Sequence, residues 1–312
     1  MKKGSVTSPL RILILGGTGF LSGTLARVAL ARTHKVWCVT RGRRPLPPGA
    51  TGIVADRRDA SSMERALLGM DVQWDLVVDC IGYEPEDARE DIQLFRGRAD
   101  HLIFVSTDFV YSHERRILPV REEGTAYQSE GYGGLKRSCE EILASSRPSP
   151  LRWTIVRPTH IYGPGSLLGC LPHHSRDPEL PRRIATHSPL LLVGGGHFLQ
   201  QPVHARDLAE LCLDIAGRSE ADHQILNVAG PDIVESREYY RILAESLGVE
   251  LITKETPVAD YLPHHPEQSP LLCHRIYDMQ RLRSIGLSPP STPLRKGLAD
   301  QLHHLLQEDA GI

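Results

Sequence analysis

The sequence predicts an α/β protein of the doubly wound type, a parallel sheet with helices on both faces and a smaller C-terminal lobe attached. Strand and helix patterns alternate along the first half of the chain. The strands there are short and almost continuously apolar, as in a parallel sheet buried on both faces. A glycine-rich turn joins the first strand to the first helix. The length of 312 residues fits one large domain with an appended lobe.

The alternation starts with a strand at Arg11–Leu15, followed by helical periodicity over Phe20–Ala31. Further strands are expected at 35–40, within 50–56, at 74–81, at 101–106 and at 152–156. Further helices are expected at 61–68, 85–96 and 132–145. Parallel strands joined through helices by right-handed crossovers give the doubly wound sheet.

The composition and the periodicity of the sequence change after Pro158. Residues 163–189 are rich in proline, histidine and glycine and show weak periodicity. A strand that enters a helix is expected over 202–216, a strand over 224–228 and an amphipathic helix over 294–306. We therefore expect a dinucleotide-binding domain at 1–162 with returns at about 201–230, and a substrate lobe at 163–200 and 231–312.

Composition narrows the class of protein. The net formal charge is -2, and phosphate-binding surfaces of nucleic-acid proteins are strongly basic. No apolar run approaches the roughly 20 residues of a membrane helix. The six cysteines are scattered, and the paired histidines are adjacent residues that point in different directions, so no metal site is expected. We expect a cytoplasmic protein that acts on a small molecule and binds neither nucleic acid nor membrane.

The glycine-rich turn is the clearest local motif. Gly16, Gly17, Thr18 and Gly19 follow the first strand, and Phe20 and Leu21 open the helix. Glycines at these places permit a tight turn and close approach of a pyrophosphate to the helix N-terminus, as in the Rossmann type of sheet. The alternative is a glycine turn that binds no ligand.

The end of the second strand indicates which dinucleotide would bind. An acidic residue there would accept a hydrogen bond from the 2′-hydroxyl of NAD. The sequence has Arg41 and Arg43 instead, followed by Arg44, and arginines can pair with the 2′-phosphate of NADP. We therefore favour NADP over NAD. The alternative is that these arginines form a solvated loop.

A threonine, a tyrosine and a lysine are the candidate catalytic residues. Tyr132 and Lys136 are four residues apart and share one face of the predicted helix. A nearby ammonium lowers the pKa of a phenol, so the pair could move a proton to or from a carbonyl or alcohol oxygen. Thr107 follows an apolar strand at the sheet edge where such folds bind ligands, and its hydroxyl could orient that oxygen.

Together these motifs resemble the extended short-chain dehydrogenases/reductases, and within them the NAD-dependent epimerase/dehydratase (nucleotide-sugar) family. The resemblance spans roughly residues 11–230. Its motifs are GGTGFLS at 16–22, VADRRD at 54–59, VSTDFVY at 105–111, YGGLK at 132–136, RPTHIYGPG at 157–165, PVHARDLA at 202–209 and NVAG at 227–230.

The resemblance implies further roles. It would place Asp56 and Arg57 against the adenine, and it would pass Cys80, Ile81 and Gly82 beneath the ribose and pyrophosphate. Pro158, His160 and Ile161 would border the nicotinamide, and Thr107, Tyr132 and Lys136 would be catalytic. It implies hydride transfer at a carbinol or keto carbon of a sugar or nucleotide sugar, and a possible homodimer. An epimerase, an NADPH-dependent keto-sugar reductase, and a non-catalytic dinucleotide sensor or RNA-binding relative all stay open.

The departures from the family pattern narrow the chemistry. Nucleotide-sugar dehydratases have an Asp-Glu pair after the threonine, whereas here Asp108 is followed by Phe109, so dehydratase activity is disfavoured. His160 stands where the family often has asparagine, and Gln200 where an arginine often grips the substrate's phosphates. A standard nucleoside-diphosphate sugar is therefore a less certain substrate than a sugar-like one.

Overall fold

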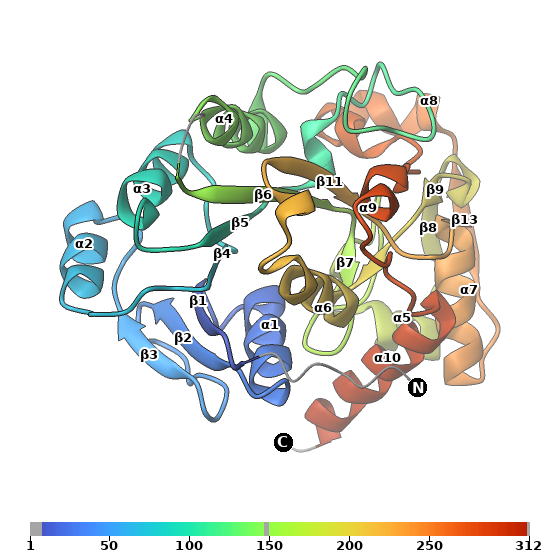
Figure 1. Ribbon diagram of the computed structural model, residues 1–312. Coiled ribbons are helices and arrows are strands. Elements are labelled where there is room, and N and C mark those ends of the chain that lie inside the picture. The colour runs from blue at the N-terminus through green and yellow to red at the C-terminus, as the bar shows by residue number, and fades with distance from the viewer. Residues whose placement is uncertain (1–7, 147–149, 311–312) are drawn as a thin grey trace, which may run out of the picture. The chain divides into compact units, whose positions relative to one another are not determined.

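The structure is a computed structural model that describes residues 8–146 and 150–310 (Figure 1). Contacts divide the chain into two compact units. The first consists of Met1–Ser106, Leu135–Val156 and Ala209–Ile225, and the second of Thr107–Gly134, Arg157–Leu208 and Leu226–Ile312. The functional domain boundaries expected at 162/163 and near 201–230 remain a prediction.

A seven-stranded sheet is the centre of the first unit, in the order β11-β6-β5-β4-β1-β2-β3. Its strands are β1 (Arg11–Leu15), β2 (Lys35–Thr40), β3 (Thr51–Val54), β4 (Leu76–Asp79), β5 (His101–Val105), β6 (Arg152–Pro158) and β11 (Gln224–Val228). The pairs from β3 through β6 are parallel, with Leu15 beside both Val39 and Asp79. This order is that of a doubly wound sheet, and it confirms the predicted fold class.

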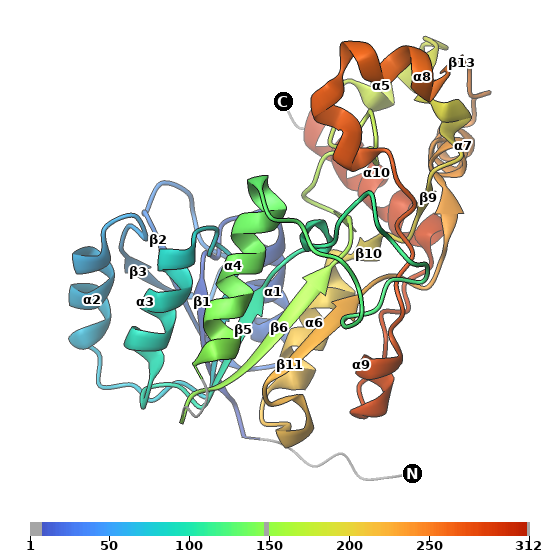
Figure 2. The ribbon, with the colours of Figure 1, turned by 90° about the horizontal axis from the view of Figure 1, so that it is seen from above.

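Helices cover both faces of this sheet. They are α1 (Phe20–Ala31), α2 (Ala60–Leu68), α3 (Pro85–Phe95), α4 (Gly131–Ser145) and α6 (Ala205–Ile215). Met63 of α2, Phe95 of α3 and Leu143 of α4 pack in one core cluster with Leu13 and Phe104 of the sheet. Figure 2 shows α2, α3 and α4 along one face of the strands, with α1 behind them.

The second unit contains short strands in three two-stranded sheets. They pair as β7 (Ile161–Tyr162) with β10 (Val203–His204), β9 (Leu199–Gln200) with β12 (Val234–Glu235), and β8 (Leu190–Val193) with β13 (Thr253–Thr256). Its helices are α5 (Leu180–Ala185), α7 (Ser236–Leu247), α8 (Val258–Tyr261), α9 (Gln280–Ser284) and α10 (Leu294–Ala310). Tyr162, Tyr239 and Tyr240 pack there with Leu298 in a separate core. Within the described part of the chain, no helix is both long and apolar enough to cross a membrane.

Some elements end at different residues than expected. The predicted strand at 74–81 is shorter, because Trp74 forms only an isolated bridge with Ala99. At its other end, the Asp79 carboxylate accepts a hydrogen bond of 2.8 Å from Ile81 N, so the chain turns there. The helix expected over 294–306 continues to Ala310. These differences leave the order of elements unchanged.

Candidate functional site

The glycine turn between β1 and α1 is packed tightly against β2. Gly16 and Gly17 have φ angles of +113° and +116°, which side chains of L-residues rarely permit. The Gly16 nitrogen donates to the carbonyl oxygen of Val39 at 2.9 Å. A Cβ atom on Gly17 would lie 2.5 Å from the Cβ of Cys38. The turn therefore requires glycine for conformation at Gly16 and for both conformation and space at Gly17.

Helix α1 begins immediately after Gly19. The φ angle of Gly19 is −83°, and its nitrogen donates to the Ser22 hydroxyl at 3.2 Å. A Cβ atom on Gly19 would have the Ser22 hydroxyl oxygen as its nearest neighbour in space beyond the adjacent residues, at 3.2 Å, so there is room for it. Phe20 and Leu21, which open the helix, are half-buried. The first turn of a helix has unpaired N–H groups and a positive dipole end, both of which favour an anion.

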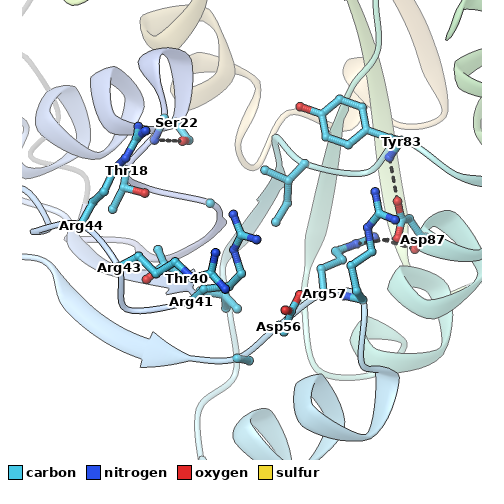
Figure 3. A pocket seen from close by; sticks show the side chains of 16 residues that line it. Thr18, Ser22, Thr40, Arg41, Arg43, Arg44, Asp56, Arg57, Tyr83 and Asp87 are labelled. Atoms are coloured by element: carbon cyan, nitrogen blue, oxygen red, sulfur yellow. Dashed lines mark hydrogen bonds and ion pairs between the residues drawn. The ribbon is translucent and has the colours of Figure 1, made fainter.

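A cavity of about 590 Å³ lies beside this turn, within the range typical of small-molecule sites (Figure 3). All of its lining residues belong to the first unit. Those predicted as cofactor-binding are Gly16, Thr18, Gly19, Arg41, Arg43, Asp56, Arg57 and Ile81. The others are Ser22, Val39, Thr40, Arg44, Ala55, Arg58, Tyr83 and Asp87.

Three exposed arginines follow β2 at one side of this cavity. Arg41, Arg43 and Arg44 all line it, and Figure 3 shows Arg41 and Arg43 beside Thr40. Within residues 8–146 and 150–310, none of the three forms an ion pair. Their charges are therefore available to an anionic ligand, and no acidic residue stands at the end of β2.

Arg57 differs from these arginines because its charge is already paired. Its guanidinium is 6 % exposed and lies 3.3 Å from Asp79, 3.1 Å from Asp87 and 2.9 Å from Asp91. Burial alone would lower the pKa of Arg57, but the carboxylates, Asp79 foremost, raise it above its ordinary value. Burial raises the pKa of Asp91, although the charge of Arg57 opposes this rise. Arg57 thus lines the cavity, and its guanidinium is paired with the carboxylates of Asp79, Asp87 and Asp91.

The segment after β4 approaches the same cavity. Ile81 lines it, whereas Cys80 and Gly82 are not among the lining residues. A Cβ atom on Gly82 would lie 2.2 Å from the Asp79 carboxylate and 2.7 Å from the Phe104 ring, so only glycine fits. Tyr83 lines the cavity, and its nitrogen donates to Asp87 at 2.7 Å. No periodicity or motif in the sequence indicated this tyrosine.

Lys136 is buried, and its side chain is fixed by hydrogen bonds to the backbone. Its Nζ donates to the carbonyl oxygens of Gly82 and Val105, each at 2.6 Å. The Nζ also lies 4.1 Å from the centroid of the Phe104 ring. Burial lowers the pKa of Lys136, although the nearby Asp79 opposes this effect. A lysine held in this way has a defined position and a weakened affinity for its proton.

Thr107 and Tyr132 belong to the second unit, and Lys136 to the first. The Thr107 hydroxyl oxygen accepts a hydrogen bond of 3.3 Å from Phe109 N. The Tyr132 side chain is 47 % exposed, and its ring meets the Phe109 ring edge-on at 6.1 Å between centroids. Tyr132 and Lys136 lie on α4 one turn apart, as predicted, so their side chains share a face of that helix.

Pro158, His160 and Ile161 also belong to the second unit, and none of them is among the residues that line the cavity. Burial and the positive charges of Arg176 and Arg275 lower the pKa of His160 to about 4, although the negative charge of Asp108 opposes them. His160 is therefore neutral at physiological pH. Gln200 is 1 % exposed, and within the described residues its side-chain nitrogen has no hydrogen-bond partner.

The doubly wound sheet, the glycine turn and the cavity beside it define a dinucleotide-binding α/β protein. A family model agrees. Residues 12–229 match the model of the NAD dependent epimerase/dehydratase family, and the chain belongs to this family.

Similar proteins include a stem-loop binding protein and a reductase. The chain is 27 % identical over 245 residues to the chloroplast stem-loop binding protein of 41 kDa b of Arabidopsis thaliana, covering 74 % of this chain and 61 % of that protein. It is 24 % identical over 249 residues to the 2′-dehydrokanamycin reductase of Streptomyces kanamyceticus, covering 77 % and 67 %. It spans only 27 % of the length of an uncharacterized Mycobacterium tuberculosis relative.

A solved structure shows the same fold. The UDP-glucose 4-epimerase of Thermotoga maritima, solved with UDP-glucose, matches with a TM-score of 0.76 at 19 % sequence identity. The match covers 96 % of this chain and 99 % of that one.

Proposed function

We propose that this chain is an NAD(P)-dependent oxidoreductase that acts on a carbinol or keto carbon of a sugar or nucleotide-sugar-like substrate. The observation that supports this most is Lys136. Its amino group is buried and hydrogen-bonded to two backbone carbonyls, on the helix that has Tyr132 one turn earlier. A lysine with a purely structural role needs no tyrosine one turn earlier on the helix. The proposed proton transfer does need an acid/base group there.

The first unit would hold the pyrophosphate and the adenosine of the dinucleotide. The glycine turn and the start of α1 would bind the pyrophosphate, with Gly16, Gly17, Thr18, Gly19, Phe20 and Leu21 around it. Asp56, Arg57, Cys80, Ile81 and Gly82 would form the adenine and ribose side, and Pro158, His160 and Ile161 the nicotinamide side. The nicotinamide, when bound, supplies or accepts the hydride.

The chain's own residues would handle the proton and position the substrate. Tyr132 would donate a proton to the substrate oxygen in reduction and remove it in oxidation. The Lys136 ammonium would stabilise the phenolate and so lower the pKa of Tyr132 toward neutrality. The Thr107 hydroxyl would hold the same oxygen in place.

Of the two dinucleotides we favour NADP, and with it a reductase. Arg41 and Arg43 line the cavity, are exposed and have no carboxylate partner among the described residues, which suits a 2′-phosphate. The similarity to 2′-dehydrokanamycin reductase supports a keto-sugar substrate that need not be a nucleotide sugar. The fold shared with a UDP-glucose 4-epimerase supports the epimerase instead.

Binding of the four dinucleotides tests this proposal first. The purified protein is checked for co-purified nucleotide and then titrated calorimetrically with NAD, NADH, NADP and NADPH. Preference for NADPH supports a reductase, and retained NAD supports an epimerase. Absence of binding for all four contradicts the proposal.

Turnover of the Tyr132→Phe variant tests the chemistry. We expect loss of NADPH oxidation in a panel of keto sugars and dTDP- or UDP-keto sugars, with the affinity for NADPH unchanged. The phenol is the proposed proton donor, and phenylalanine preserves the ring contact with Phe109. Turnover equal to the wild type would contradict the role of Tyr132.

A non-catalytic function is the second candidate, because one relative is a chloroplast stem-loop binding protein. The observation on this chain that suits it is the group of exposed arginines after β2. A gel-shift titration with a stem-loop RNA, with and without NADPH, separates the two. Competition between the RNA and NADPH at physiological salt, without turnover of any keto sugar, would favour this candidate.

A further inference from the structure

The carboxylate of Asp108 is buried and held by two side chains from far along the sequence. Asp108 Oδ2 lies 2.5 Å from the guanidinium of Arg275 and accepts a hydrogen bond of 2.5 Å from the hydroxyl of Tyr277. The three residues are 2 %, 2 % and 4 % exposed, respectively. All three belong to the second unit. We refer to Asp108, Arg275 and Tyr277 as the clamp.

The clamp is connected to Thr107 through Phe109. Asp108 begins a 3₁₀ turn, Asp108–Val110, that immediately follows Thr107. The guanidinium carbon of Arg275 lies 4.4 Å from the centroid of the Phe109 ring. The Phe109 nitrogen in turn donates to the Thr107 hydroxyl oxygen. Arg275 therefore contacts both residues that follow Thr107.

Phe109 also connects the clamp to the beginning of α4. Its ring meets the Tyr132 ring edge-on. Its carbonyl oxygen lies so near Gly133 that a Cβ there would approach it to 2.1 Å. The turn at 108–110 is therefore packed directly against the start of α4.

We propose that Arg275 and Tyr277 are positioning residues, which hold Asp108 so that Thr107 and Tyr132 keep a fixed mutual geometry through Phe109. This inference rests on the proposed function, in which Thr107 and Tyr132 contact the substrate oxygen. Neither Arg275 nor Tyr277 needs to touch the substrate.

The clamp also argues against Asp108 as a proton donor. A donor must carry a proton and face the reacting atom, whereas Asp108 Oδ2 is engaged by a cation and a hydroxyl. Burial raises the pKa of Tyr277, and the negative charge of Asp108 raises it further, so the phenol stays protonated and donates. Asp108, at the position after the threonine where the dehydratases have the first residue of their Asp-Glu pair, would thus hold the turn at 108–110 in place.

Tyr277→Phe is the most specific test, and Tyr240→Phe is its matched control. Both tyrosines are buried in the second unit, and each donates one hydrogen bond, to Asp108 and to the Cys170 carbonyl respectively. Hydrogen exchange of the intact protein is followed by mass spectrometry in peptides that cover 107–111 and 131–134. We expect about tenfold faster exchange there in Tyr277→Phe and no change in Tyr240→Phe.

Kinetics and cofactor binding complete the test. With a keto sugar that the wild type reduces, Tyr277→Phe should lower kcat about tenfold, and Arg275→Met about a hundredfold, at an NADPH affinity within about twofold of wild type. Equal exchange in Tyr277→Phe and Tyr240→Phe would overturn the proposal. So would an Asp108→Asn variant that abolishes turnover while exchange at 107–111 is unchanged, because Asp108 would then act chemically.

The exchange comparison needs no substrate, so it stands even if no keto sugar is reduced. Failure of the wild type to bind any dinucleotide would contradict the proposed function and leave the positional role of the clamp to be decided by exchange. Unchanged exchange together with NADPH binding and turnover would contradict the clamp alone.

Discussion

The side-chain nitrogen of Lys136 lies 2.6 Å from the carbonyl oxygen of Val105, the last residue of β5. The same nitrogen donates to Gly82 O, so it joins the end of β5 to the segment that follows the adjacent strand β4. A residue required only for chemistry would not need both bonds. Lys136 therefore stabilises the sheet edge as well as the proposed active site.

Lys136→Met should lower the free energy of unfolding by about 3 kcal/mol, because two buried carbonyl oxygens lose their donor. Urea unfolding monitored by circular dichroism measures this. Lys296→Met is the control: Lys296 is an exposed helix residue paired with Asp300 at 2.5 Å, and its loss should cost under about 0.5 kcal/mol. Equal effects of the two substitutions would show that the Lys136 bonds add nothing to stability.

The paired substitution Arg41→Ala/Arg43→Ala should weaken NADPH binding by about 10- to 100-fold and leave NADH binding nearly unchanged. The reason is the loss of charge-assisted contacts to the 2′-phosphate. Calorimetric titration with both cofactors measures the difference, which should shrink at high salt. Arg65→Ala removes an exposed arginine of α2 outside the cavity and serves as the control. An equal loss of NADH affinity would show that these arginines do not distinguish the 2′-phosphate from the 2′-hydroxyl.

Two glycines of the turn should respond differently to alanine. Gly17→Ala should destabilise the fold by about 2–5 kcal/mol, because the φ angle is positive and the new Cβ collides with Cys38. Gly19→Ala meets only the Ser22 hydroxyl oxygen, at 3.2 Å, so the fold should tolerate it. If the pyrophosphate of the dinucleotide lies against Gly19, the affinity of Gly19→Ala for the dinucleotide should nevertheless be at least tenfold weaker. Thermal unfolding and dinucleotide titration of both variants separate stability from binding.

His101 should make the protein less stable in mild acid. Burial lowers its pKa to about 4, and its Nε2 lies 2.8 Å from the hydroxyl oxygen of Thr154, which donates to Ala221 O. Nε2 must therefore be the donor, and no described residue accepts a hydrogen bond from Nδ1. Because the pKa in the unfolded chain is about 6.5, the stabilising contribution is complete above that pH. It is lost as the pH falls toward about 4, at up to about 1.4 kcal/mol per pH unit.

Urea unfolding of wild type and His101→Gln at pH 7, 6 and 5 measures this contribution. Glutamine can donate to Thr154 but does not titrate. The stability advantage of the wild type over the variant should therefore shrink as the pH falls. Parallel pH profiles for the two proteins would show that His101 does not titrate on unfolding in this range.

Local patterns in the sequence predicted the strands of the sheet and the first helix well. Arg11–Leu15, Phe20–Ala31, Lys35–Thr40 and Gln224–Val228 have the bounds that their apolar patterns indicated. Apolar strands bounded by turn residues depend on neighbours in the sequence, which makes them readable. Helix α7 was not predicted. Its buried residues nevertheless include Ser236, Tyr239, Tyr240 and Leu243, at the i, i+3, i+4 and i+7 spacing of an amphipathic helix, so the signal was present in the sequence.

Pairing across long stretches of chain could not be predicted. The sequence indicated Arg57 only as an adenine neighbour, whereas its partners include Asp91, 34 residues away. Asp108 and Arg275 are 167 residues apart, and nothing in either segment marks a partner. Charged residues of this kind are typical of solvated loops, so only tertiary structure shows that they are buried together.

The clamp also has a consequence for synthesis of the chain. Every residue that lines the cavity lies between Gly16 and Asp87. The partners of Asp108 are near the other end of the chain, at Arg275 and Tyr277. On the ribosome, all the residues that line the cavity are therefore synthesised while the turn after Thr107 still lacks its anchor. A nascent chain stalled before residue 275 would have the glycine turn and the residues that line the cavity, but the turn after Thr107 would not be anchored.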